Sequence, residues 1–357
     1  MKFALALDPR SWSRGDSHTA VTRTFRLAEL ADLAGFDSLW LTEDPEGWDA
    51  FAVLGAIASA TSAIRIGTGV TNPFHRHPNL ISASVATIDR LSAGRAFLGL
   101  GRGQPEWYAR ALGVPAFSPL ALLEETLDLL DQWWTPPHRA SSPGPIPIAD
   151  WERSIHPIAR PPIYLAAAGP RALDLAGRRA DGVLFNELAS PHFLAGAIDR
   201  VRAAARLAGR DPEQLAFFVN PAVRISDNPD VFLERKKSFI AMVYSLPGMD
   251  QMLDSPHFDT KAIMHGVRKA MRTEEILKRG GGFPDLRREG DLKLARSLIP
   301  TEFVAELSAI GSLETIGDRL RLLESIGATH IFLDRDGLPE EVDASTNLLK
   351  QLQQLVP

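Results

Sequence analysis

The sequence predicts an α/β fold, a single (β/α)8 TIM barrel in which eight parallel strands alternate with helices. Short apolar segments of strand length alternate along the chain with longer segments whose apolar residues recur at helical spacing. The first predicted strand is followed by Asp8 and Pro9 rather than by a glycine fingerprint, which argues against a doubly wound nucleotide-binding sheet. Barrels of this kind commonly reach this length as one domain, so we assign residues 1–357 to a single domain.

The composition is that of an ordinary globular protein, with 45% hydrophobic residues, 23% charged residues and a net charge of −5. The absence of cysteine excludes disulfides, thiolate metal sites and cysteine nucleophiles. The acidic balance without a basic block argues against nucleic acid as a partner, and no apolar window is long enough to predict a membrane span. The N-terminus lacks the apolar core of a signal peptide, so we expect a cytoplasmic enzyme.

The first half of the chain contains four predicted βα units. The segment 65–104 is the clearest, because two apolar strands flank a helix that begins at Pro78 and ends before Gly94. The predicted strands are 3–7, 38–42, 65–68 and 96–101, and the predicted helices are 22–34, 49–60, 78–91, 105–112 and 120–134. The second half supplies strands at 163–167, 182–185, 216–225 and 329–333, with helices at 170–179, 191–208, 313–326 and 339–355.

Two segments interrupt this alternation. Residues 135–162 contain eight prolines, and we interpret them as a surface excursion because the alternation resumes afterwards. Residues 229–310 contain several probable helices and no convincing strand, which predicts a helical insertion between the seventh and eighth strands. Insertions at the ends of barrel strands commonly shape the substrate pocket.

The candidate active-site residues follow the predicted strands, because ligands bind at the carboxyl ends of barrel strands. After the second strand, Glu43 and Asp44 lie close to Trp48, an arrangement that can supply a general acid or base and an aromatic wall. For Asp49 we prefer a cap of the next helix. After the third strand, Gly69 permits either the close approach of a ligand or a simple turn before Pro73, and both readings stay open.

Two further loops predict an anion site. Small residues and an arginine precede a helix after the fourth strand and again after the fifth. Each signal is weak alone, but together they could hold a phosphorylated cofactor. The residues are Gly101, Arg102, Gly103 and Gln104 in one loop, and Ala167, Ala168, Gly169, Pro170 and Arg171 in the other. The sequence contains no nucleotide phosphate loop, no zinc-protease motif and no predicted metal site.

These blocks resemble the bacterial luciferase-like flavin oxidoreductases, and within them the deazaflavin-dependent branch that includes methylenetetrahydromethanopterin reductase. The likeness covers nearly the whole barrel and is most specific in TGVTNP, ATIDRLSAGRA, LGLGRG and AAAGPRAL. It implies coenzyme F420 at the strand ends, a cis peptide at Gly69-Val70 that supports the ring, and a homodimer. The cofactor-binding residues would be Asp8, Glu43, Gly69, Val70, Thr71 and Asn72, with the phosphate on the two loops named above.

The sequence departs from this family at two positions. Several relatives have Asp-His where this chain has Glu43 and Asp44, and the glucose-6-phosphate dehydrogenase of the class has an acid at the position of Gln104. The mechanism and substrate of that dehydrogenase therefore should not be transferred. We favour Asp44 as the proton-handling residue facing the substrate and Glu43 as a partner of the cofactor. The alternative is that both are solvated acids and that the proton comes from water or from the 229–310 insertion.

The sequence thus predicts an oxidoreductase that transfers hydride between coenzyme F420 and a small organic substrate. Trp48 and the 229–310 insertion would form the substrate wall. One alternative is an FMN-dependent monooxygenase of the same family that uses oxygen. The other alternative is a barrel that binds a flavin without turnover.

Overall fold

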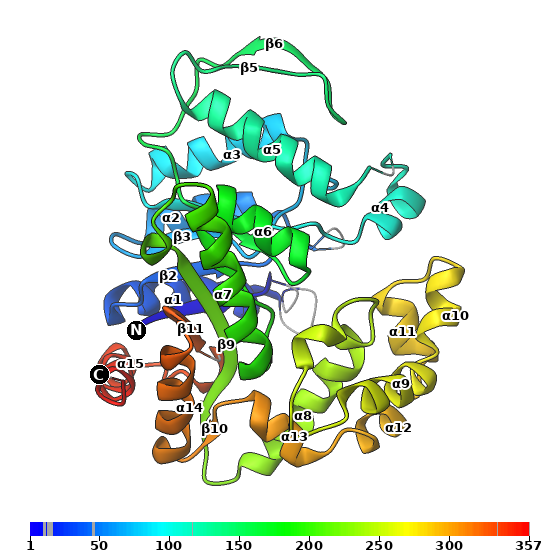
Figure 1. Cartoon of the computed structure of the whole chain (residues 1–357). Coiled ribbons are helices and arrows are strands. Elements are labelled where there is room, and N and C mark those ends of the chain that lie inside the picture. The colour runs from blue at the N-terminus through cyan, green and yellow to red at the C-terminus, as the bar shows by residue number, and fades with distance from the viewer. Residues whose placement is uncertain (10–11, 13–16, 45–46, 116, 334, 357) are drawn as a thin grey trace.

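The computed structural model describes the chain except for residues 10–11, 13–16, 45–46, 116, 334 and 357 (Figure 1). Eight parallel strands close into a barrel, because β9 pairs with both β8 and β11. The barrel strands are β1 (Lys2–Leu7), β2 (Ser38–Leu41), β3 (Arg65–Thr68), β4 (Ala96–Leu100), β7 (Ile163–Ala166), β8 (Gly182–Leu184), β9 (Ala216–Ile225) and β11 (His330–Leu333). The predicted barrel is confirmed.

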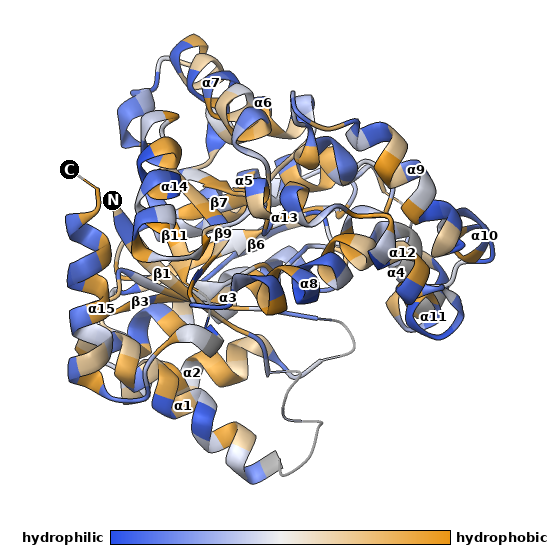
Figure 2. Cartoon of the chain, turned by 90° about the horizontal axis from the view of Figure 1, so that it is seen from below, coloured by the Kyte–Doolittle hydropathy of each residue, from blue (hydrophilic) through white to orange (hydrophobic). Residues whose placement is uncertain are grey.

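Helices surround the barrel, and Figure 2 shows mostly hydrophobic strands inside helices of mixed polarity. The surrounding helices are α1 (Ser17–Ala34), α2 (Ala50–Ala60), α3 (Pro78–Leu91), α4 (Pro105–Leu112), α5 (Pro119–Trp134), α6 (Pro170–Arg179), α7 (Pro191–Leu207), α14 (Leu313–Ser325) and α15 (Val342–Gln354). The Asp49 side chain accepts a hydrogen bond from the Ala52 N–H at 3.0 Å, so it caps α2 as predicted.

The barrel interior is filled by aromatic side chains at the level of the strand centres. Trp40 lies at the middle of this layer, with ring centroids 4.4 Å from Phe97 and 4.6 Å from Phe218. Gly67 makes room for the layer, since a Cβ there would lie 2.5 Å from the Phe97 ring. This packed layer is the floor on which the strand-end site is built.

A polar cluster closes the opposite end of the barrel. Asp37 pairs with Arg65, and it lies 3.1 Å from Lys2 Nζ and 3.4 Å from His330 Nε2. Burial raises the pKa of Asp37, but bonds and charges from His330 and Arg65 outweigh it and hold the pKa well below its usual range. Burial lowers the pKa of His330, and Asp37 offsets this only in part.

The proline-rich excursion contains a hairpin that the sequence analysis did not predict. Strand β5 (Arg139–Ser142) pairs antiparallel with β6 (Ile148–Glu152). The Trp133 indole N–H on α5 donates to the Trp151 carbonyl at 3.1 Å. The Arg153 guanidinium donates to the Asn79 carbonyl on α3 at 3.0 Å. These contacts fasten the hairpin over two barrel helices, and such long-range partners are not visible in the local sequence.

The segment between β9 and β11 forms a group of helices beside the barrel and next to α4 (Figure 1). Its elements are α8 (Pro229–Phe239), a π-helical turn at Ile240–Tyr244, a 3-10 turn at Asp250–Leu253, α9 (Thr260–Ala270), α10 (Thr273–Lys278), α11 (Phe283–Glu289), α12 (Leu292–Ser297) and α13 (Thr301–Leu307). A two-residue strand, β10 (Ile310–Gly311), follows and pairs with the end of β9.

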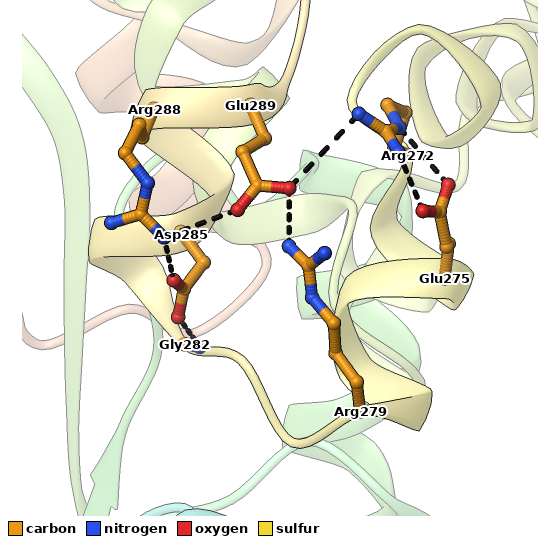
Figure 3. Close-up of polar contacts among 7 residues, drawn as sticks. All are labelled: Arg272, Glu275, Arg279, Gly282, Asp285, Arg288 and Glu289. Carbon is orange, nitrogen blue, oxygen red and sulfur yellow. Dashed lines mark hydrogen bonds and ion pairs between the residues drawn. The ribbon is translucent and has the colours of Figure 1, made fainter.

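Ion pairs hold the outer end of this helical group together, as Figure 3 shows. Arg279 pairs with Glu289, Arg288 pairs with Asp285, and Arg272 pairs with Glu275. The loop between α10 and α11 also touches α4, because a Cβ on Gly280 would lie only 1.9 Å from an Arg110 guanidinium nitrogen. The helical group therefore extends from the end of β9 to the helix that follows β4.

Candidate active site

A cavity of about 470 Å³ lies at the carboxyl ends of the barrel strands. Its volume is in the range of sites for small ligands and cofactors. Residues from the ends of six strands line it, and α8 contributes two more. The lining residues are Ala6, Leu7, Asp8, Trp40, Thr42, Gly69, Leu184, Phe185, Asn186, Glu187, Asn220, Ala222, Lys236, Phe239, Phe332, Leu333 and Arg335.

The loop after β3 forms one wall of this cavity. The Gly69-Val70 peptide is cis, as the family resemblance predicts. The Val70 side chain lies against β4, because a Cβ on Gly101 would lie 2.7 Å from Val70 Cγ2 and 3.4 Å from the Ala166 Cβ. Glycine at 101 thus lets the loops after β3, β4 and β7 come together. Of the predicted residues, Val70 and Gly101 are therefore neighbours in space.

The cavity also has a polar wall that the sequence analysis missed. Lys236 on α8 pairs with Glu187, which follows β8, and the Tyr244 hydroxyl donates to the Glu187 carbonyl. Arg335 donates to the Asp8 carbonyl at 3.2 Å. Burial, aided by the charge of Glu187, raises the pKa of Tyr244, so this hydroxyl stays a neutral donor. The position of Glu187 three residues after the end of β8 was the signal that could have identified it.

Glu43 connects the loops after β2 and β3. Its side chain is 1% exposed, and its carboxylate accepts hydrogen bonds from the Thr71 hydroxyl and, at 2.6 Å, from Arg76 Nε. Arg76 also donates to Asp49 at 2.7 Å. Arg76 therefore joins the buried Glu43 to Asp49, whose side chain is 54% exposed. Glu43 does not line the cavity itself.

Asn72, Gly103 and Tyr108 form a second group next to Glu43. The Asn72 amide donates to the Tyr108 hydroxyl at 3.3 Å. Gly103 has a φ of +59°, and a Cβ there would lie 2.6 Å from the Tyr108 ring. Burial is the main cause that raises the pKa of Tyr108, and the charges of Asp44 and Glu43 act in the same direction. The structure thus brings four predicted residues around a tyrosine that the sequence analysis did not identify.

The two predicted anion-binding loops follow the neighbouring strands β4 and β7 and lead into α4 and α6. Strands β4 and β7 pair in parallel, so the loops that follow them lie at the same end of the sheet. Gly169 is the N-cap residue of α6, and a Cβ there would meet no atom within 4 Å, so the space beside this helix start is open. Arg102 and Arg171 are both exposed at the surface near these helix starts.

Trp48, the predicted substrate wall, lies outside the residues that line the cavity. Its side chain is 48% exposed, and its ring centroid lies 5.8 Å from that of Trp12. A substrate role for Trp48 therefore stays a prediction. In the part of the chain that the structure describes, no cluster of histidine and acidic side chains is arranged to hold a metal ion. Within the same residues, no helix combines the length and the apolar character needed to cross a membrane.

Comparison with known proteins identifies the family. The model of the family described as luciferase-like monooxygenase matches residues 1–330. A 5,10-methylenetetrahydromethanopterin reductase of Methanolobus tindarius is 27% identical over 312 residues, which are 87% of this chain and 89% of the relative. An F420-dependent hydroxymycolic acid dehydrogenase of Mycobacterium tuberculosis is 34% identical over 213 residues, which are 54% of this chain and 57% of the relative.

A solved structure shows the same fold over the whole chain. The coenzyme F420-dependent tetrahydromethanopterin reductase of Methanopyrus kandleri superposes with a TM-score of 0.75 at 22% identity, covering 99% of this chain and 98% of the other. The resemblance inferred from the glycine-bearing motifs is confirmed by these matches. Since the family model covers nearly the full barrel, the chain belongs to the luciferase-like monooxygenase family.

Proposed function

We propose that this protein is an oxidoreductase that transfers hydride between coenzyme F420 and a small organic substrate. The observation that carries the proposal is the strand-end cavity, which Gly69 borders on one side and Lys236 of α8 on another. The relatives named above are reductases and dehydrogenases, and two of them are named as F420-dependent, which supports F420 over FMN. Coenzyme F420, when bound, supplies the carbon that accepts or donates hydride.

The residues present fit such a coenzyme. The cavity is large enough for a ring system, and the glycines at 101 and 103 keep the loops beside it free of side chains that would clash with Val70 and Tyr108. The open helix start at Gly169 and the exposed guanidinium of Arg102 suit a phosphate. We assign the ring to the wall formed by Gly69 and Val70, with Asp8, Thr71 and Asn72 around it. We assign the phosphate to Gly101, Arg102, Gly103, Gln104, Ala167, Ala168, Gly169, Pro170 and Arg171.

The substrate would occupy the part of the cavity below α8. Phe239 and Lys236 line it from this helix, which supports a role of the 229–310 insertion in binding the substrate. Asn186, Glu187 and Asn220 face the same cavity and can donate and accept hydrogen bonds. A cavity with both apolar and polar walls suits a small molecule with a polar reacting group, and closure by α8 helps to exclude water.

Asp44 is our candidate for proton transfer. It is half-buried after β2, close enough to Tyr108 for its charge to raise the pKa of that phenol. Glu43 would support the site from its bonds to Thr71 and Arg76, which hold the loops after β2 and β3 in position. The role of Glu43 as a direct partner of the cofactor stays part of this proposal.

The test is to purify the protein and titrate it with coenzyme F420 and with FMN, following the fluorescence of each. We expect saturable binding of F420 and weaker binding of FMN. Turnover of reduced and oxidised F420 with a panel of alcohols and unsaturated compounds then tests catalysis. Preferred binding of FMN with oxygen uptake would favour the monooxygenase. Binding of F420 without turnover of any compound would favour the non-catalytic barrel.

We further propose that the protein is a cytoplasmic homodimer, as the family resemblance implies. Light scattering after size-exclusion chromatography measures the mass directly. The expected value is twice the 39.0 kDa of the chain. A mass of one chain at micromolar concentration would contradict the dimer.

A further inference from the structure

One wall of the strand-end cavity is built from the loop after β8, the strand β9 and the helix α8. Glu187 comes from the loop, Asn220 from β9 and Lys236 from α8, and all three line the cavity. In the closed barrel, β11, β1 and β2 separate β9 from β3 in one direction, and β4, β7 and β8 separate them in the other. This wall therefore lies across the cavity from Gly69, and a ring placed against Gly69 has the wall on its other side.

The backbone of this wall is held in an unusual conformation. Leu188 and Ala222 have φ values of +63° and +51°, a region that residues other than glycine rarely occupy. The Leu188 N–H donates to the Asn220 carbonyl at 2.8 Å, and the Tyr244 hydroxyl donates to the Glu187 carbonyl. Such conformations persist only where the surroundings over-determine them, and they gather at functional sites. The contacts therefore fix the wall before any ligand binds.

Two side chains of the wall present hydrogen-bond donors. The Asn220 side-chain oxygen accepts from the Ala222 N–H at 3.0 Å, so the NH2 is the other end of this amide. No group in the described part of the chain accepts from that NH2. The Lys236 ammonium pairs with Glu187, and their side chains are 22% and 19% exposed. Since an ammonium group has three N–H donors, a cation and an amide NH2 stand on one wall, which suits an oxygen that gains negative charge.

From this geometry we infer that Lys236 and Asn220 bind the oxygen of a carbonyl substrate and stabilise the negative charge that forms on it during hydride transfer. The inference rests on the proposed function, because coenzyme F420 supplies the hydride. Glu187 is then a positioning residue, since it holds the Lys236 ammonium in the wall.

The step balances in the reducing direction as follows. The carbonyl carbon gains a hydride with its electron pair, and the π electrons of the C=O bond move to the oxygen. The oxygen then takes up one proton, for which Asp44 is our candidate, and the coenzyme gives up one proton as it becomes oxidised. A ketone or aldehyde and the reduced coenzyme thus become an alcohol and the oxidised coenzyme. Lys236 and Asn220 stabilise the alkoxide-like oxygen between these two events.

The test measures oxidation of reduced coenzyme F420 by the whole chain with butanone, cyclohexanone and benzaldehyde as probes. Lys236→Met removes the ammonium, and the double variant Lys236→Met/Glu187→Gln removes it without leaving an unpaired carboxylate. Lys236→Arg keeps a cation with N–H donors. Asn220→Asp keeps an oxygen for the Ala222 N–H and removes the NH2. Lys293→Met, at an exposed position on α12 of the same helical group, is the matched control.

We expect Lys236→Met, the double variant and Asn220→Asp each to lower kcat by about 10²–10³-fold, because removing one donor of this kind has about that effect. Coenzyme affinity, measured by fluorescence, should be unchanged. Lys236→Arg should retain more of the rate than Lys236→Met, and Lys293→Met should match the parent. The double variant or Asn220→Asp with the kcat of the parent would overturn the inference.

A higher KM with unchanged kcat would also overturn it, because the wall would then bind the ground state and the transition state equally. A parent that turns over other compounds and none of these three probes would overturn the inference while the proposed function stood. A parent that binds no coenzyme F420, or that turns over no compound at all, would overturn the proposed function and this inference together.

Discussion

Arg76 Nε donates a hydrogen bond to the Glu43 carboxylate at 2.6 Å, and the two side chains are 10% and 1% exposed. Through this bond the loop after β3 is fastened to the loop after β2, beside the cavity. A second nitrogen of the same guanidinium, Arg76 Nη2, donates to the Asp49 carboxylate at 2.7 Å, and Asp49 also caps α2. The contact therefore connects the candidate active site to the start of a barrel helix.

Arg76→Ala should destabilise the fold by about 3 kcal/mol, because it leaves the buried Glu43 carboxylate without its partner. The free energy of unfolding in urea measures this. Glu43→Gln added to Arg76→Ala should recover part of the loss, since the unpaired charge is removed. Arg139→Ala is the control, because its ion pair with Asp150 is exposed and should matter little. Equal losses in the two arginine variants would contradict a structural role for the buried pair.

Asp44→Asn should slow the chemical step by about 10²–10⁴-fold while leaving coenzyme affinity intact, since proton-transfer catalysis contributes about that much. The measurement is single-turnover hydride transfer with a substrate found in the screen described above. Glu43→Gln is the companion variant and should lower stability more than the rate constant, because its carboxylate holds Thr71 and Arg76. Parent-like single-turnover rates in both variants would show that another group moves the proton.

Arg102→Ala should weaken the binding of coenzyme F420 by about tenfold at low salt, because it removes an exposed cation from the proposed phosphate loop. The difference from the parent should shrink as salt is raised, since the charge of an exposed group is screened. Arg206→Ala, an exposed arginine at the end of α7, serves as the control. Unchanged affinity in Arg102→Ala would move the phosphate to other residues.

The cluster at the closed end of the barrel predicts a dependence of stability on pH. The pKa of His330 is lowered from 6.5 in the fold, so the unfolded chain takes up a proton below about pH 6.5 that the folded chain does not. Stability should therefore fall as the pH drops through 6.5. The pKa of Asp37 is lowered from 3.8, so its contribution is present above that pH and is lost as the pH falls below it.

Urea unfolding between pH 8 and pH 5 tests the histidine part of this prediction. His330→Gln should flatten the decline near pH 6 relative to the parent, because it removes the titrating ring. His257→Gln, which replaces a 72% exposed histidine, should keep the decline of the parent. Identical slopes in the parent and in His330→Gln would contradict the assignment.

The sequence by itself determined the barrel and the face on which the site lies. Apolar segments of strand length, separated by helices with proline at their start and glycine at their end, are local patterns, and local patterns are enough to order eight βα units. Since all strands of such a barrel run in one direction, the loops after them must share one end. Gly69 could for this reason be considered for a ligand site from its position after a strand, and the family resemblance added Asp8; both line the cavity.

Only the tertiary structure decided which side chains meet. The pairing of Glu43 with Arg76, of Asn72 with Tyr108, and of Glu187 with Lys236 joins residues that are 33, 36 and 49 positions apart. Local sequence patterns do not predict these contacts, because the contacts depend on the stagger of the barrel strands and on the position of α8 beside the cavity. The hairpin of β5 and β6 also depends on its contacts with α3 and α5, whereas the composition of residues 135–162 predicted only a surface excursion. Packing, and not local pattern, sets the chemistry of this site.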